Sequence, residues 1–149
     1  MSELLEVDDL RVEFGAMTAV AGVSFRVEPG ETYAIVGESG SGKTTLIRAV
    51  AGLLPSHAGS VRFQGRELRG MSARAFRPLR RHMAMTFQDP VGSLSPRLTV
   101  RSILTEPYRI QGIRKRDLDA EARRLLKLVG LTEEFGGRYP YQLSGGQAC

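Results

Sequence analysis

Tryptophan is absent from this sequence of 149 residues, and cysteine and histidine are scarce. The one cysteine, Cys149, can form no internal disulfide and has no metal-ligating partner nearby, so cysteine chemistry contributes nothing to the predicted function. His57 lies in a short loop without an acidic or cysteine companion, and His82 follows a group of arginines. We therefore expect both histidines to be surface residues, neither ligands nor catalytic bases.

Long apolar runs are missing as well. No window approaches the run of about 18 apolar residues that a membrane-spanning helix needs. The first ten residues are acidic and have no apolar core, so we expect no signal peptide and a cytoplasmic location. A hydrophobic content of 42% with 25% charged residues is typical of a globular protein, and the length suits one domain or most of a larger one.

Acidic residues are outnumbered, since 21 Lys and Arg against 16 Asp and Glu give a net charge of +5. Such a charge fits a nucleic acid, an anionic membrane face or a phosphorylated ligand. The densest basic cluster contains no interleaved aromatic except Phe76; its members are Arg74, Arg77, Arg80 and Arg81. This pattern favours a solvated basic face, and we predict no nucleic-acid partner.

The first half of the chain has the pattern of strands and one helix. Apolar residues alternate over residues 5–14 and 23–27, which predicts strands with one buried face, followed by a turn at residues 28–31. The apolar run 33–36 predicts a buried strand, and a helix is expected from Thr44 until Pro55 blocks it. Further strands are predicted at residues 61–63, before a Gln64-Gly65 turn, and at 83–87.

The second half turns helical after a loop rich in Pro, Gly and Ser at residues 89–97. Thr99 is expected to cap one helix, and an apolar stripe from Leu118 to Val129, stopped by Gly130, predicts another. Four acidic residues are interpreted as turn and cap residues: Asp8, Asp9, Asp117 and Asp119. We predict an α/β fold in two parts, a β-rich core over residues 1–91 and a helical part over residues 92–149.

A glycine-rich loop between the predicted strand 33–36 and the following helix matches the pattern G-x-x-x-x-G-K-[ST]. Glycines let successive backbone N–H groups point at phosphate oxygens, and the helix that follows directs its positive dipole end at the same charge. Lys43 is expected to reach the β- and γ-phosphates, and the Thr44 hydroxyl to bind Mg²⁺. The predicted nucleotide contacts are Gly37, Glu38, Ser39, Gly40, Ser41, Gly42, Lys43, Thr44 and Thr45.

Near the C-terminus stands the sequence Leu143-Ser144-Gly145-Gly146-Gln147. By itself this segment could be a polar helix entry with Ser144 as the N-cap. Together with the phosphate loop and Gln88, in this order and spacing, it closely resembles the ABC transporter ATPases. The segment 87–97, with Glu106-Pro107 and Arg138-Tyr139-Pro140, is similar to the peptide and nickel importer branch of that family.

The resemblance covers essentially the whole chain and implies roles for several residues. Phe14 occupies the position of the aromatic that stacks on adenine, although it can also be an inward strand residue. Gln88 corresponds to the glutamine that contacts Mg²⁺ and the attacking water, which with Lys43 makes the predicted catalytic pair. Ser144, Gly145, Gly146 and Gln147 correspond to the motif that closes over ATP held by a second ATP-binding subunit in a head-to-tail dimer.

Partners and location also follow from the resemblance. It implies a P-loop NTPase domain of the ABC type on the cytoplasmic face of the plasma membrane, bound to integral permease subunits through their coupling helices and acting indirectly with a solute-binding protein. ATP and Mg²⁺ are the implied cofactors, and oligopeptides or related small solutes the implied cargo.

In this family, some of the residues needed for ATP hydrolysis follow the signature motif: an apolar strand ending in Asp-Glu and a later histidine. These are missing from the 149 residues, so we expect an incomplete domain that alone is inactive, marginally stable and prone to aggregate. Two other functions stay open. One is a non-catalytic nucleotide-binding fragment that lends its signature motif to a full-length partner. The other is a soluble ABC-type ATPase acting on DNA or ribosomes.

Overall fold

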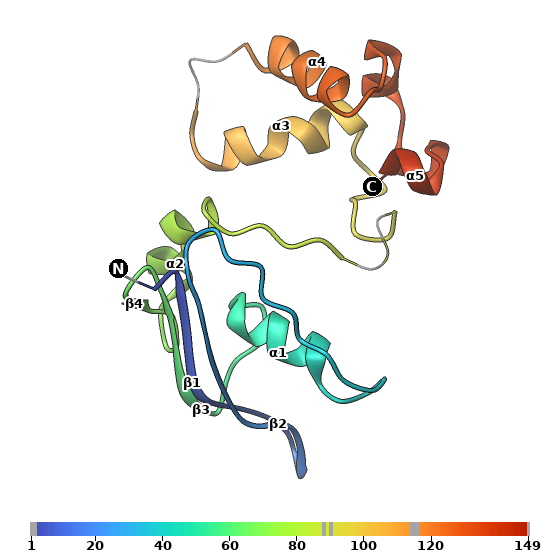
Figure 1. Ribbon diagram of the computed structural model, residues 1–149. Helices are drawn as coiled ribbons and strands as arrows, with labels where there is room; N and C mark the ends of the chain where they lie inside the picture. The colour runs from blue at the N-terminus through green and yellow to red at the C-terminus, as the bar shows by residue number, and fades with distance from the viewer. Residues whose placement is uncertain (1–2, 88, 90, 114–116, 149) are drawn as a thin grey trace. The chain divides into compact units, whose positions relative to one another are not determined.

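The computed structural model describes residues 3–87, 89, 91–113 and 117–148. The chain divides into two compact units, residues 1–85 and residues 86–149. The first unit contains the β-sheet and the second is helical (Figure 1). The division falls between Met85 and Thr86, whereas the sequence placed the boundary after residue 91.

The first unit is built on a four-stranded antiparallel sheet in the order β2-β1-β3-β4. Strand β1 (Leu5–Phe14) and strand β2 (Met17–Val27) form a long hairpin, and β3 (Ala58–Phe63) pairs with the other edge of β1. The Gln64-Gly65 turn, in which both residues have positive φ, joins β3 to the short β4 (Arg66–Glu67). The strand predictions for residues 5–14, 23–27 and 61–63 are confirmed.

A bulge interrupts β1 at Asp8 and Asp9, where its pairing with both neighbours shifts register. Asp9 has a φ of 41°, and a Cβ added to Gly59 would lie 2.4 Å from its carbonyl oxygen. Only glycine fits so close to the bulged backbone. The prediction that Asp8 and Asp9 are turn or cap residues is therefore wrong, because both lie inside a strand.

The core of the first unit lies where α1 (Lys43–Val50) packs against the hairpin. Leu46 and Ala49 of α1 are buried with apolar residues of the three longer strands, and Phe76 and Leu79 of α2 (Ala73–Arg80) complete the cluster. Helix α1 ends before Pro55, because Gly52 takes a φ of 66° and its N–H turns back to the carbonyl of Ala49. The expectation that Pro55 stops this helix is wrong by one turn.

Two predicted strands are extended segments without β-pairing in the structure. Residues 33–36 and 83–87 have no strand assignment, and Val36 is 91% exposed. Within the part of the chain that the structure describes, no strand lies beside either segment to complete a ladder. Tyr33 instead stacks on Phe25 of β2, with ring centroids 4.9 Å apart. The apolar run was recognised correctly, but a strand also needs a hydrogen-bonding neighbour.

The second unit is a small helical body. Helix α3 (Val100–Ile110) and helix α4 (Leu118–Leu128) are followed by two short 3₁₀ helices, η1 (Glu133–Gly137) and η2 (Pro140–Gln142), and by α5 (Gly145–Ala148). Thr99 caps α3, Asp117 caps α4, and Gly130, with a φ of 74°, follows the end of α4, as the sequence predicts. Asp119 lies in the first turn of α4 and pairs with Arg101 at 3.2 Å.

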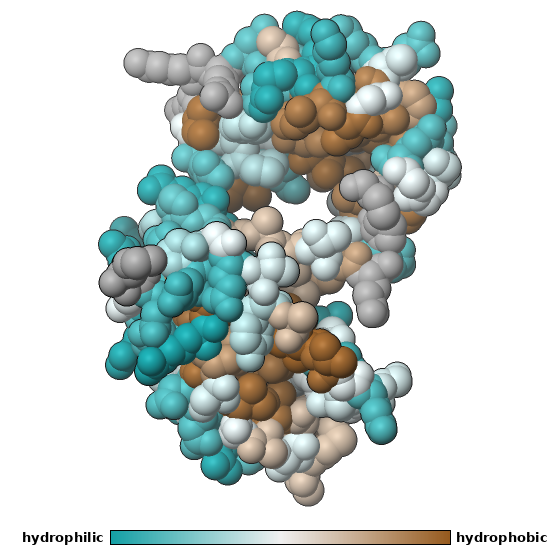
Figure 2. Space-filling view, viewed as in Figure 1, coloured by the Kyte–Doolittle hydropathy of each residue, from teal (hydrophilic) through white to brown (hydrophobic). Residues whose placement is uncertain are grey.

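The contact between α3 and α4 combines a polar cluster with an apolar face. The Tyr108 hydroxyl donates to Glu121 at 2.6 Å, and Arg124 donates to the same carboxylate at 2.7 Å. Apolar residues of α3 and α4 line a cavity of about 420 Å³ that α5 also borders, and apolar side chains gather on this unit in Figure 2. No helix in the described ranges combines the length and apolarity that crossing a bilayer requires.

Candidate nucleotide-binding site

The glycine-rich loop lies between the extended segment 33–36 and helix α1. Gly40 and Gly42 have φ values of 82° and 87°, in the left-handed region that glycine adopts without steric cost. Between them, Ser41 donates its N–H to the carbonyl of Glu38 at 3.2 Å. The loop therefore folds back on itself immediately before the helix begins.

Gly42 is the N-cap of α1 and rests against strand β2. A Cβ added at this position would lie 2.2 Å from the carbonyl oxygen of Ala19. No side chain can be accommodated there without moving backbone, and the close approach fixes the start of α1 on the β1–β2 hairpin. The sheet thus determines where the N-terminal N–H groups of the helix point.

The side chain of Lys43 reaches back into the loop and bonds to its oxygens. Its Nζ donates to the carbonyl oxygens of Gly37 at 2.8 Å and Glu38 at 2.5 Å, and to Ser41 Oγ at 3.3 Å. Three acceptors hold one ammonium group at the centre of the loop. A cation in this position can meet an anionic oxygen that the loop N–H groups also contact.

The first turn of α1 is free of acidic side chains and contains Thr44 and Thr45. The helix dipole at this end favours negative charge, and nothing in the turn opposes it. Thr44 is exposed and Thr45 is half-buried. An exposed threonine next to the loop offers a hydroxyl oxygen, the type of ligand that a hard cation such as Mg²⁺ accepts. Three neighbouring features, the loop, Lys43 and Thr44, therefore fit a magnesium-bound polyphosphate.

Phe14 ends β1 at the tip of the hairpin, opposite Met17. Phe14 is 47% exposed, so the residue is not enclosed in the core and stays accessible to a ligand. The hairpin that carries Phe14 is the one against which Gly42 packs. The structure therefore brings the phosphate loop and the predicted stacking residue onto the same supporting element.

The signature segment lies in the second unit. Ser144 precedes α5, and its N–H is accepted by the side-chain oxygen of Gln147 at 3.0 Å. A Cβ added to Gly145 or Gly146 meets nothing within 4 Å, so neither glycine is forced by packing inside this unit. Gln88, the predicted catalytic and metal-binding residue, lies outside the described residues.

Sequence reasoning missed two residues that support this site. Ala19 acts through its backbone, so its side chain gave no signal. His57 is an exposed loop residue, as predicted, but its Nδ1 also accepts the backbone N–H of Glu13 at 3.0 Å, next to Phe14. No signal in the sequence indicated this contact, because it depends on the pairing of β3 with β1, which are distant in the chain.

The sequence profile described as ABC transporter matches residues 20–149 of this chain. The chain belongs to the ABC transporter family. The matched region of this family is its ATP-binding domain, which contains both the phosphate loop and the signature segment described above. The predicted family is thereby confirmed.

Curated ABC transporter relatives carry names of importers. The oligopeptide transport ATP-binding protein OppF of Salmonella typhimurium is 38% identical over 159 residues, which cover 97% of this chain and 48% of OppF. The glutathione import ATP-binding protein GsiA of the same organism is 47% identical over 132 residues, which cover 87% of this chain and 21% of GsiA. The chain thus spans about half or less of the length of these relatives.

Solved ABC structures share the fold. The ATP-binding cassette MJ0796, in a dimeric post-hydrolysis state bound to ADP and Pi, superposes with a TM-score of 0.81 at 25% identity, covering 97% of this chain and 65% of MJ0796. The ADP conformation of the cassette MJ1267 gives a TM-score of 0.72 at 27% identity, covering 99% of this chain and 61% of that one. The predicted α/β ABC-type ATPase fold is confirmed.

Proposed function

We propose that this chain binds Mg-ATP at residues 37–45 as the ATP-binding part of an ABC importer. The observation that carries the proposal is the position of Lys43, whose ammonium is held by three loop oxygens directly before the N-terminus of α1. A loop closed by hydrogen bonds, one central cation and a helix dipole together favour a polyphosphate over a singly charged anion.

Each of the other site residues has a task in this proposal. The Thr44 hydroxyl supplies one oxygen ligand to Mg²⁺, and Phe14, which is partly exposed, stacks its ring on the adenine. Gln88 contributes a further Mg²⁺ ligand and orients the attacking water. Mg²⁺, when bound, neutralises charge on the phosphate oxygens, while Lys43 stabilises the charge that develops during phosphoryl transfer.

The signature segment acts on a second subunit's nucleotide in this proposal. Ser144, Gly145, Gly146 and Gln147 present an N–H-rich helix start, and no side chain of the two glycines obstructs it. The dimeric state named for MJ0796 supports a paired arrangement. We expect two such subunits to associate head to tail when both carry ATP.

We propose that the transporter uses this nucleotide site to drive the import of peptides or similar small solutes. This assignment is supported by the names of OppF and GsiA, and by the segment 87–97 that resembles peptide importers. In this arrangement the chain is peripheral to the cytoplasmic face of the membrane and docks on permease subunits. It does not touch the transported solute itself.

Calorimetric titration of the chain with Mg-ATP tests the nucleotide site. Lys43→Ala removes the central cation, and we expect its affinity for Mg-ATP to fall at least about tenfold, because a charged hydrogen-bonding group contributes about 1.5–3 kcal/mol. Arg48→Ala, in the last turn of the same helix, is the matched control and should bind as the wild type does. Equal affinity of all three proteins would contradict the proposed site.

Co-purification with the membrane subunits of an oligopeptide importer tests the transport assignment. We expect the chain to be retained by those permease subunits in detergent and not by ribosomes or DNA. Retention by nucleic acid alone would favour a soluble ABC-type ATPase instead. Stimulation of a full-length relative's ATPase without permease binding would favour the non-catalytic partner function.

A further inference from the structure

His57 fills a gap in the hydrogen bonding of β1. The pairing of β1 with β3 ends at Arg11 opposite Ala58, three residues before β1 itself ends at Phe14. At this point His57 donates its N–H to the carbonyl of Arg11 at 2.8 Å, and its Nδ1 accepts the N–H of Glu13 at 3.0 Å. The imidazole therefore supplies the acceptor that a longer β3 would have supplied through its backbone.

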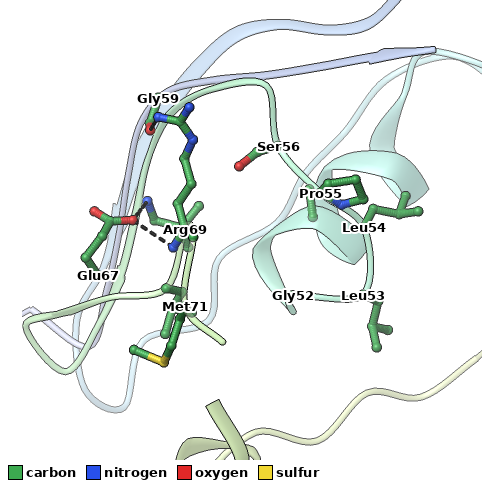
Figure 3. A pocket seen from close by; sticks show the side chains of 13 residues that line it. Gly52, Leu53, Leu54, Pro55, Ser56, Gly59, Glu67, Arg69 and Met71 are labelled. Atoms are coloured by element: carbon green, nitrogen blue, oxygen red, sulfur yellow. Dashed lines mark hydrogen bonds between the residues drawn. The ribbon is translucent and has the colours of Figure 1, made fainter. Parts of the chain in front are cut away.

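His57 is itself held by a side chain from beyond the sheet edge. Arg69 donates from Nη2 to the carbonyl of His57 at 2.9 Å and from Nη1 to the carbonyl of Gly59 at 3.0 Å. Glu67 accepts the backbone N–H of Arg69 at 3.0 Å and that of Val61 at 3.1 Å. Figure 3 shows Glu67 and Arg69 along the wall of a cavity of about 850 Å³, with the guanidinium reaching Gly59.

The hydrogen bond between His57 and Glu13 constrains the end of β1, the strand that finishes at Phe14. Glu13 is the neighbour of Phe14, so the bond to His57 is the last one on that side of β1 before the ring. On the other side the hairpin turn holds Phe14 against Met17. Without the His57 imidazole, Glu13 and Phe14 are still paired with β2 in the hairpin, but the other side of this strand end is no longer bonded, and such strand ends open readily.

We propose that His57 is a positioning residue for Phe14, fixing the end of β1 so that the phenyl ring is ready to stack on the base of the bound nucleotide. The inference rests on the proposed function, in which Phe14 contacts adenine. A ring already held in place loses less conformational freedom on binding, so the gain appears as affinity for the base. His57 makes no contribution to the phosphate contacts.

The test separates base binding from phosphate binding. Calorimetry would measure the affinities of the chain for Mg-ATP and for magnesium tripolyphosphate, which has the phosphates and no base. We expect His57→Ala to weaken Mg-ATP binding about two- to tenfold, the value of one hydrogen bond, and to leave tripolyphosphate binding unchanged. His57→Asn, whose side-chain oxygen can accept the Glu13 N–H, should restore most of the loss.

The matched control is His82→Ala, since His82 is the other histidine of the same unit and bonds to Arg81. It should change neither affinity. Equal losses for both ligands in His57→Ala, or no loss for either, would overturn the proposal. So would failure of His57→Asn to recover the affinity.

Hydrogen exchange keeps this inference distinct from the proposed function. The Glu13 amide should exchange faster in His57→Ala than in the wild type and in His82→Ala, whether or not nucleotide is present. If the wild-type chain binds neither ligand, the proposed function fails, and the exchange rates still decide whether His57 fixes this strand end. Unchanged exchange at Glu13 would contradict the positioning role.

Discussion

Gly42 is subject to two constraints, a positive φ and a close contact with backbone, whereas Gly40 is subject only to the first. The φ of Gly42 is 87°, and a Cβ would meet the Ala19 carbonyl at 2.2 Å, whereas Gly40 has a φ of 82° with open space around it. We expect Gly40→Ala to lower the free energy of unfolding by about 1–2 kcal/mol from backbone strain alone. Gly42→Ala should lower it by more than about 3 kcal/mol, because backbone must also move.

Urea denaturation followed by circular dichroism measures both variants. Comparing the two variants isolates the effect of the close contact between Gly42 and Ala19, since the two glycines share the loop and the left-handed conformation. Equal destabilisation would mean that the contact between α1 and β2 gives way at no cost.

The Glu67 carboxylate makes stability depend on pH. Burial raises its pKa, but hydrogen bonds from Ser60 Oγ and from the N–H groups of Val61 and Arg69 outweigh this effect and bring the pKa below its ordinary value of 4.5. A lowered carboxyl pKa stabilises the folded state above pH 4.5, and this contribution is lost as pH falls through the folded value. We expect Glu67→Gln to be less stable than the wild type at pH 7 and the difference to shrink at pH 3.

Thermal unfolding at several pH values checks this expectation. Glu133→Gln, an exposed change in the second unit, serves as the control and should show no such convergence. A Glu67→Gln difference that stays constant from pH 7 to pH 3 would show that the carboxylate's charge is irrelevant.

Among the secondary-structure elements, those with complete local signals were predictable. Strand β1 and the second half of β2 follow from their alternation, whereas residues 17–22 of β2 and the pairing of the two strands were not predicted. Helix α4 follows from an apolar stripe bounded by Asp117 and Gly130. The segments 33–36 and 83–87 were not, because an apolar run reveals hydrophobicity but not whether a neighbouring strand exists. Within the site, the phosphate loop followed from its motif. The supports from Ala19 and His57 depend on contacts between residues distant in sequence.

The N-cap of α4 offers a test at the level of one helix. Asp117 Oδ1 accepts the N–H groups of Asp119 at 3.0 Å and Ala120 at 3.1 Å. We expect Asp117→Ala to destabilise the second unit by about 1 kcal/mol, while Asp117→Asn, another good capping residue, should cost much less. Chemical denaturation followed at 222 nm measures both. An alanine variant as stable as the asparagine variant would show that the cap contributes little here.

The self-association of the whole chain depends on apolar side chains that the first unit exposes. Val36 is 91% exposed, and Tyr33, Ile47 and Leu53 are each more than 40% exposed. An unpaired extended segment with apolar residues promotes self-association. We expect the 149-residue chain to form oligomers in gel filtration at micromolar concentration, and Val36→Lys to shift it toward monomer.

Val129→Lys is the matched control, since Val129 is 66% exposed in the second unit and lies outside that segment. It should leave the elution profile unchanged. A wild-type chain that elutes as a compact monomer and melts cooperatively would refute the expectation.

The division at Met85 has an optical consequence. Without tryptophan, ultraviolet emission comes from four tyrosines, of which Tyr33 belongs to the first unit and Tyr108, Tyr139 and Tyr141 to the second. Tyr139 and Tyr141 stack with ring centroids 5.7 Å apart, and the Tyr108 hydroxyl donates to a carboxylate. Three of the four tyrosines therefore belong to the helical unit that carries the signature segment, and only Tyr33 reports on the first unit. A single tryptophan placed in the sheet would give the phosphate-loop unit a fluorescence signal of its own, separate from the tyrosine emission.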